Sequence, residues 1–298
     1  MYYRRKIIFG LLEVFDGKLK KTDFQKLLMI LSKHQEKPSF EFVPYKFGCF
    51  SFQSYADIRT MIKYEQIVEE KSDPESFWVK DDPTNYYLTL KKKDQLILDY
   101  LKSKFSNFST EDLIKYTYRK YPYYAINSVI AEKLLTTEEL KEVHKKQPSN
   151  NIKALYTIGY EGISQEHYLN RLIQNNIKVL CDVRRNPLSM KYGFSKNQLL
   201  KACKGLGIEY VHIPEVGISS DKRKKLNTQK DYDELFEEYN NVLTEETSIT
   251  GIEKIKTLLE KNNRIAITCF EANIHQCHRK HLAINMIKKT SEFKIIHI

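Results

Sequence analysis

With 298 residues, of which 41% are hydrophobic and 29% charged, the chain has the size and composition of a two-domain soluble globular protein. No apolar run approaches the roughly 18 residues of a transmembrane helix, and five scattered cysteines favour free thiols in the cytoplasm over a disulfide framework. Both halves share the net charge of +11, with 26 basic against 21 acidic residues in 1–150 and 23 against 17 in 151–298. A polyanionic partner and a generally lysine-rich composition are both compatible with this excess.

The first half predicts a mostly helical module. Phe40–Cys49 is extended, because Pro44 and Gly48 exclude a helix. Helices followed by a hairpin suggest a winged-helix module, with the lysines that follow the hairpin as candidate nucleic-acid contacts. These lysines are Lys91, Lys92 and Lys93. The predicted elements are helices over 6–15, 22–34, 55–64, 95–105 and 109–120 and two strands around a turn within 77–90.

A motif in this half resembles a known family. Leu27-Leu28 and the segment FVPYKFGCFS (42–51), followed by a helix and a hairpin, resemble the Panacea or SocA-type antitoxin-associated domain over about residues 5–125. The resemblance implies a winged-helix-like fold that binds DNA or a protein partner.

A boundary near residue 150 separates this module from an α/β domain. A charged helical pattern over 134–146 is followed by the polar linker 147–151, which gives domains of 1–148 and 152–298. The second domain alternates strands with helices, which predicts a mainly parallel sheet with helices on both faces. The expected strands are 155–158, 179–183, 209–213, 265–270 and 294–298, and the expected helices are 165–175, 196–206, 231–243, 250–261 and 278–289.

Polar motifs follow four of these strands, at the carboxyl ends where open α/β sheets build their sites. They are GYEG (159–162), DVRRNPLS (182–189) with GFS (193–195), HIPEVG (212–217), and CFE (269–271) with CHR (277–279). In this order the motifs resemble the family of domain of unknown function 488 over about residues 154–298. The resemblance implies a compact α/β domain whose motif residues form one pocket. The third motif departs from the usual His-x-Pro-x-Leu-Gly, because Val216 precedes Gly217 here.

Asp182 and Glu271 are the expected general acid and base. A carboxylate beside the end of an apolar strand is partly buried and needs a partner or a raised pKa. We expect Arg184 and Arg279 to hold phosphate, since a guanidinium grips it bidentately. Structural ion pairs with the same arginines, a core role for His212 and a helix cap for Ser195 remain as alternatives. Glu161 and His278 are expected to support catalysis, and Tyr160, Arg185, Ser189, His212, Cys269 and Cys277 to contact the substrate.

Thiol and imidazole side chains near the C-terminus suggest a zinc site as one interpretation. They belong to Cys269, His275, Cys277 and His278. The single Cys-x7-Cys-His spacing lacks the ligand set of a zinc knuckle, so we expect no metal and no cofactor. A Cys277 nucleophile, with His278 and Arg279 lowering the pKa of its thiol, is a second possibility. A basic run in a long loop predicts either a solvated surface or contacts to a phosphate backbone. Its residues are Lys222, Arg223, Lys224 and Lys225.

Together these features predict an enzyme that acts on nucleic acid, DNA rather than RNA, or on a nucleotide. The expected reaction is hydrolysis of a glycosidic or phosphoester bond, with the N-terminal module bringing the substrate. Two alternatives need no catalysis: a winged-helix regulator that senses a small anionic ligand, and an antitoxin-like factor that neutralises a protein partner. Each fits a role in bacterial defence. The sequence assigns no oligomeric state.

Overall fold

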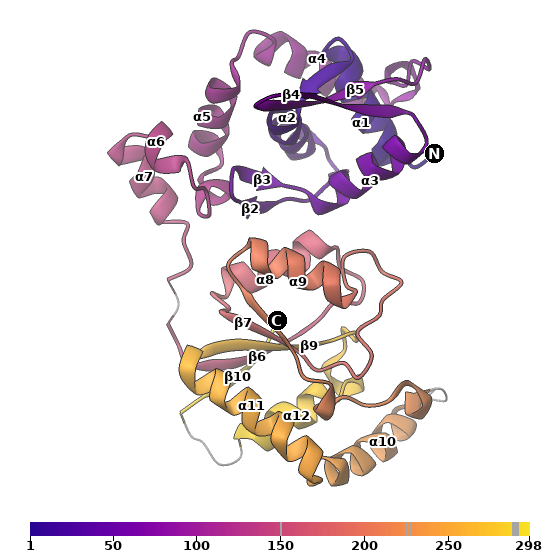
Figure 1. Cartoon of the computed structure of the whole chain (residues 1–298), viewed down its shortest axis with the longest axis vertical. Helices are drawn as coiled ribbons and strands as arrows, with labels where there is room; N and C mark the ends of the chain where they lie inside the picture. Colours follow the sequence, from indigo (N-terminus) through magenta and orange to yellow (C-terminus); the bar gives the residue numbers. More distant parts are fainter. Residues whose placement is uncertain (150, 224–225, 227, 288–291) are drawn as a thin grey trace. The chain divides into compact units, whose positions relative to one another are not determined.

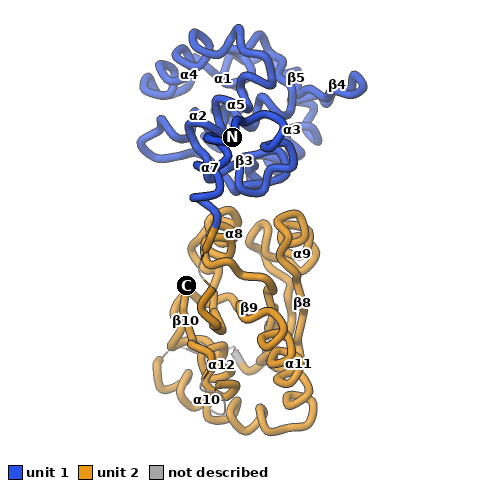
Figure 2. The backbone as a smooth tube through the Cα atoms, turned by 90° about the vertical axis from the view of Figure 1, so that its left-hand side faces the viewer, with its two compact units in different colours: residues 1–147 blue, residues 148–298 orange. Residues whose placement is uncertain are grey.

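The computed structural model describes residues 1–149, 151–223, 226, 228–287 and 292–298. The chain forms two compact units, Met1–Gln147 and Pro148–Ile298, which are coloured separately in Figure 2. Within the described ranges, no helix combines the length and the apolar character that a membrane span requires.

The N-terminal unit consists of helices around a small antiparallel sheet. This sheet has the strand order β1-β5-β4, and a separate hairpin pairs β2 with β3. Apolar side chains of the helices and the sheet, among them Phe24 and Trp78, form its core. The elements are α1 (Tyr3–Val14), β1 (Lys18–Lys20), α2 (Lys21–His34), β2 (Val43–Tyr45), β3 (Gly48–Phe50), α3 (Phe52–Lys63), β4 (Ile67–Ser72), β5 (Glu75–Lys80), α4 (Lys92–Phe105), α5 (Thr110–Lys120), α6 (Ala131–Leu134) and α7 (Thr137–His144).

The hairpin of this unit lies earlier in the chain than its sequence predicts. It was expected within residues 77–90, but the paired strands are β4 and β5, and residues 87–89 form only a 3-10 turn. Strand β4 lacks a clear apolar pattern because it carries the charged residues Glu69 and Glu70. These side chains pair with Lys21 and Lys18 on neighbouring elements. Local periodicity does not detect a strand that is held by ion pairs across the sheet.

Two helix boundaries also differ from the prediction. Helix α3 begins at Phe52 because Ser51 caps it, its hydroxyl oxygen accepting a hydrogen bond from the Ser54 backbone N–H. The helical pattern predicted over 134–146 begins as a helix only at Thr137, the first residue of α7, because Thr136 forms a capping box with Glu139. Leu134 is the last residue of the preceding helix α6.

The C-terminal unit confirms the predicted α/β fold. Five strands, all parallel, form a sheet of order β10-β6-β9-β7-β8. Helices α8 and α9 cover one face, and α10, α11 and α12 cover the other (Figure 1). The elements are β6 (Ala154–Gly159), α8 (Gln165–Gln174), β7 (Val179–Asp182), α9 (Lys196–Gly205), β8 (Glu209–His212), α10 (Gln229–Val242), α11 (Glu246–Asn262), β9 (Arg264–Cys269), α12 (Arg279–Ile287) and β10 (Lys294–His297).

The central strands explain why this fold could be read from the sequence. Every residue of β6, β7 and β9 is buried, as expected for strands covered by helices on both faces. Such strands appear as short continuous apolar runs, and each is bounded here by polar or turn residues. The buried Arg264 at the start of β9 donates to the backbone carbonyl of Asn175, so its charge does not disrupt the core.

Candidate functional site

The carboxyl ends of β6, β9, β7 and β8 meet at one edge of the parallel sheet. The register places Gly159 beside Cys269, and Asp182 between Thr268 and His212. A cavity of about 390 Å³ opens at this edge. Its lining consists of Tyr160, Arg184, Arg185, Asn186, Leu188, Ser189, Met190, Ile218, Cys269, Phe270 and Glu271. The other candidates from the motifs, which do not line the cavity, are Asp182, Glu161, His212, Cys277, His278 and Arg279.

Asp182 is not placed as a general acid or base. Its carboxylate is fully buried and accepts four hydrogen bonds, which is the capacity of its lone pairs. Oδ1 accepts from the backbone N–H and Nε of Arg184, at 3.1 and 2.8 Å, and Oδ2 accepts from Nη2 of Arg184 and the Tyr210 hydroxyl, at 2.5 and 2.6 Å. The ion pair weighed as an alternative is therefore present, and the pair fixes the arginine.

Arg184 lies at the cavity wall with its guanidinium held on three sides. Besides the Asp182 contacts, Nη1 donates to the Tyr160 hydroxyl at 2.7 Å. Burial acts to lower the pKa of Arg184, but the hydrogen bonds and charge of Asp182 outweigh it and raise that pKa, so the guanidinium stays protonated. Because Arg184 also lines the cavity, its fixed positive charge can attract an anion bound there.

Two residues of β8 help to position Arg184, one through its backbone carbonyl and one through Asp182. His212 places Nε2 at 3.0 Å from the Arg184 carbonyl oxygen and Nδ1 at 3.2 Å from Nζ of Lys196. Because a carbonyl only accepts and an ammonium only donates, these contacts fit the tautomer with the proton on Nε2. Tyr210, which the motifs did not single out, donates to Asp182. It lies two residues before His212 on β8, hence on the same face of the strand, and this spacing was the signal that could have identified it.

Aromatic rings form another part of the wall. Tyr160 stacks on Phe194 with centroids 4.3 Å apart and an interplanar angle of 9°, and it meets Phe270 edge-on at 5.3 Å. The Arg184 guanidinium carbon lies 5.1 Å from the centroid of the Tyr160 ring. The cavity therefore combines cationic groups with flat apolar surfaces.

The loop that carries Glu271 is fixed by close backbone contacts. A Cβ atom on Gly159 would lie 1.9 Å from the carbonyl oxygen of Glu271, so only glycine fits there. Arg279 donates to that carbonyl at 2.5 Å and to the Ala272 carbonyl at 3.2 Å. Glu161 accepts from the Ala272 N–H at 2.9 Å. Arg279 is 2% exposed, and its guanidinium positions the Glu271 loop through these backbone contacts.

The loop of residues 189–195 closes on itself. The Ser195 hydroxyl accepts from the Ser189 N–H at 3.1 Å and donates to the Ser189 carbonyl at 3.0 Å. Ser195 stands at the N-cap position of α9, but its side chain makes no cap hydrogen bond, so the alternative of a side-chain cap is not found. Lys191 reaches from this loop to the Tyr160 carbonyl at 2.8 Å.

Cys269, Cys277 and His278 are brought together beneath the cavity. Each is buried, and Cys269 also contributes to the lining. Burial raises the pKa of the Cys277 thiol well above its ordinary value, and the neighbouring Cys269 adds to that effect. The lowered pKa that a Cys277 nucleophile requires is therefore not found.

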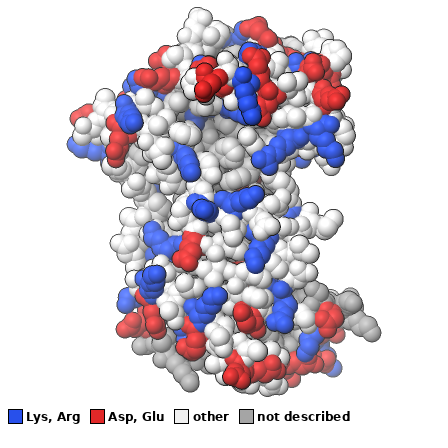
Figure 3. All heavy atoms as spheres, in the orientation of Figure 1, with Lys and Arg blue, Asp and Glu red and all other residues white. Residues whose placement is uncertain are grey.

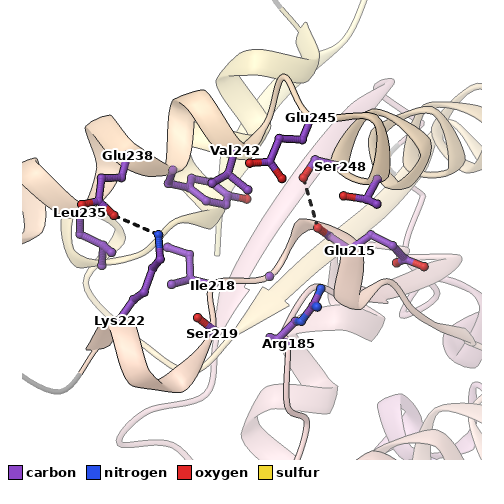
Figure 4. Close-up of a pocket in the computed structure, with 13 residues that line it drawn as sticks. Arg185, Glu215, Ile218, Ser219, Lys222, Leu235, Glu238, Val242, Glu245 and Ser248 are labelled. Atoms are coloured by element: carbon purple, nitrogen blue, oxygen red, sulfur yellow. Dashed lines mark hydrogen bonds and ion pairs between the residues drawn. The ribbon is translucent and has the colours of Figure 1, made fainter.

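A second cavity of about 210 Å³ adjoins the first, because Arg185 and Ile218 line both. Figure 4 shows Arg185 on the loop after β7 and Glu215 on the next loop, with the first turn of α11 beyond them. The Arg185 Nη1 donates to the Pro214 carbonyl at 3.2 Å. One face of this exposed arginine is thus anchored at the boundary between the two cavities.

Of the basic run of residues 222–225, Lys222 lines this second cavity. Lys222 pairs with Glu238 at 3.0 Å across its mouth (Figure 4), in an exposed ion pair of the kind that contributes little stability. Arg223 ends the 3-10 turn Ser220–Arg223. Lys224 and Lys225 lie outside the described residues.

Residues 91–93 do not flank the hairpin of the N-terminal unit. They lead into α4, where Lys93 pairs with Glu36 at 3.0 Å and Nζ of Lys91 lies 5.2 Å from the centroid of the Tyr3 ring. Acidic side chains lie among the basic ones on the face of this unit seen in Figure 3.

The comparisons with known proteins concern the C-terminal unit. The family model described as "Domain of unknown function DUF488" matches residues 164–285, a range that includes Asp182, Arg184 and Glu271. The match does not extend to residues 5–125, so the Panacea-type resemblance there stays a prediction. No curated protein matches the chain.

Proposed function

Residues 164–285 form a domain of the DUF488 family, whose description assigns no activity, and from the geometry of its cavity we propose that the C-terminal unit hydrolyses a bond in a nucleotide or nucleic acid. One observation carries the proposal. A fixed arginine, an aromatic wall and a carboxylate converge at the carboxyl ends of adjacent parallel strands.

The size and lining of the cavity match the parts of a nucleotide. Its volume of about 390 Å³ lies within the range of small-molecule sites, roughly 300–1,000 Å³. Arg184 and Arg185 supply donors for a phosphate, because guanidinium groups present paired N–H groups to its oxygens. The rings of Tyr160 and Phe270 offer surfaces on which a base can stack.

Glu271 is the carboxylate that lines the cavity, so it takes the role of general base and acid. In the proposed reaction a water molecule adds to phosphorus or to the anomeric carbon while its proton passes to Glu271. The bond to the leaving oxygen or nitrogen breaks, and Glu271 returns the proton to that group. Arg184, already oriented by Asp182, stabilises negative charge without reorganising.

The rim of the cavity favours a polymeric substrate over a free nucleotide. Leu188 and Met190 line the opening and are 76% and 104% exposed, and Phe270 is 43% exposed. Apolar side chains in such positions can insert between neighbouring bases and unstack them. This wedge set (Leu188, Met190 and Phe270) is a feature that a small-molecule site does not need.

The N-terminal unit supports a binding role. Its three-stranded sheet has the order β1-β5-β4, and both α2 and α3 lie between β1 and β4 in the chain. This arrangement matches that of a winged helix. The hairpin that forms the wing is acidic, and Glu69, Glu70 and Glu75 neutralise Lys21, Lys18 and Lys20. This charge pattern favours a protein partner over the DNA phosphate backbone for this unit.

The experiment is a product assay with the full chain. Single- and double-stranded DNA, RNA and free nucleotides are incubated with the protein, and products are identified by mass spectrometry. We expect Glu271→Gln to reduce turnover by about 10²- to 10⁴-fold, the usual contribution of general acid–base catalysis. Arg185→Ala is expected to raise KM, because it removes a phosphate contact without touching the proton transfer.

Glu237→Gln on the exposed face of α10 is the matched control, since it makes the same change of charge away from the cavity. Unchanged turnover in Glu271→Gln would remove this residue from the mechanism. Saturable ligand binding with no product from any substrate would replace hydrolysis by the sensing role considered as an alternative.

A further inference from the structure

Two thiols and an imidazole form a compact cluster beneath the cavity. Cys269 is 2% exposed, and Cys277 and His278 are 0% exposed. The two sulfur atoms and a ring nitrogen all lie within 4.8 Å of one another. The proposed hydrolysis uses none of these three residues.

The cluster is mounted on elements that hold it in place. Cys269 is the last residue of the buried strand β9, and His278 immediately precedes α12. Between them, the 3-10 turn Ile274–Gln276 reverses the chain. Arg279 ties the start of α12 to the carbonyls of residues 271 and 272, so both ends of the loop are anchored. Ligands on rigid elements are what a specific metal site requires.

The ring of His278 is oriented as a ligand. Its Nε2 lies 3.3 Å from the backbone carbonyl oxygen of Val183, which can only accept, so Nε2 carries the proton. The Nδ1 lone pair therefore points toward Cys269, whose sulfur lies 3.7 Å away. A histidine that donates one ring N–H to a carbonyl and directs the other nitrogen at the ligand position is the usual arrangement around protein-bound metals.

The separations agree with a tetrahedral ion. Zn–S and Zn–N bonds of about 2.3 and 2.0 Å place two ligand atoms roughly 3.6–3.8 Å apart. The observed 3.7 Å between Cys269 and His278 meets this value. The largest separation in the cluster, within 4.8 Å, requires a side-chain shift of only about 1 Å.

We propose that Cys269, Cys277 and His278 bind a divalent transition metal, with Zn²⁺ as the expected ion. Thiolate and imidazole ligands select Zn²⁺ over Mg²⁺ and Ca²⁺, which prefer oxygen. Three protein ligands are the number found in catalytic zinc sites, where water or substrate takes the fourth position. Because Cys269 also lines the cavity, an ion held by this cluster would lie beside the proposed substrate site. The spacing in the sequence predicts no metal because it lacks the ligand set of a zinc knuckle, whereas the fold brings these three side chains close together.

The experiment measures metal binding by the full chain and is independent of turnover. Protein purified under reducing conditions is dialysed and analysed for Zn²⁺, and metal-free protein is titrated with Co²⁺. We expect one ion per chain, thiolate-to-cobalt charge-transfer absorption and the visible bands of tetrahedral Co²⁺. Cys277→Ser and His278→Gln should each lower affinity by more than the roughly 10- to 100-fold loss typical of outer-shell changes.

Cys203→Ser is the matched control, because Cys203 is equally buried but lies on α9, outside the cluster. It should leave the stoichiometry and the cobalt spectrum unchanged. His278→Gln retains a donor toward the Val183 carbonyl, and its thermal melting shows whether the fold survives. Substoichiometric metal in the wild type, full retention of metal in Cys277→Ser, or a Cys269–Cys277 disulfide in place of metal overturns the proposal.

Discussion

The first prediction tests how much the buried ion pair of Asp182 and Arg184 contributes to the stability of the C-terminal unit. The change is Asp182→Asn, which keeps the shape of the side chain but removes its charge and replaces one acceptor by a donor facing Arg184. Both partners are buried, with side-chain exposures of 0% and 6%. Removing one member of a buried pair leaves an uncompensated charge and costs about 3–5 kcal/mol.

That cost can be assigned to one unit of the chain. Trp78, the single tryptophan, lies buried in the N-terminal unit, so its fluorescence reports unfolding of that unit alone. Circular dichroism at the tyrosine wavelengths and in the far ultraviolet follows both units. With an m-value of about 2 kcal/mol/M in urea, a loss of 4 kcal/mol lowers the C-terminal midpoint by about 2 M. The midpoint seen by Trp78 should not move.

A double variant separates charge from packing. Asp182→Leu combined with Arg184→Met removes both charges and keeps apolar bulk, and such replacements are often neutral or stabilising. We therefore expect the double variant to be more stable than Asp182→Asn, yet unable to bind nucleotide. A midpoint shift in Asp182→Asn below about 0.5 M would mean that the pair stabilises the unit by no more than an exposed surface ion pair, which would refute the reasoning.

Two other predictions concern the same unit. Gly159→Ala should destabilise it by about 1–3 kcal/mol and lower activity, because its Cβ would meet the backbone carbonyl of Glu271 at 1.9 Å; wild-type urea midpoints for the variant would contradict this. Burial lowers the pKa of His281 below its ordinary 6.5, so its neutral form is favoured in the folded state. Stability linked to His281 is therefore present above pH 6.5 and is lost as the pH falls through its folded pKa. His281→Phe, which keeps the ring contact with Phe236, should reduce this acid sensitivity in thermal melts between pH 7 and 5, measured against wild type.

The sequence by itself determined the architecture of the C-terminal unit. The apolar runs of β6, β7 and β9 and the amphipathic helices between them record burial, and burial repeats with the period of each element. Parallel strands place their carboxyl ends together, so the meeting of Tyr160, Arg184 and Glu271 followed from the order of the elements.

Only the tertiary structure decided what those residues do. Asp182 is a fixed partner of Arg184 because Tyr210 and Arg184 fill its four acceptor positions. Arg279 donates to backbone carbonyls. Cys269 and His278 approached each other because a loop returned over the end of β9. Periodicity reports which side of an element faces the core, a local property. The partners that a side chain meets depend on the paths of distant loops, which no local pattern records.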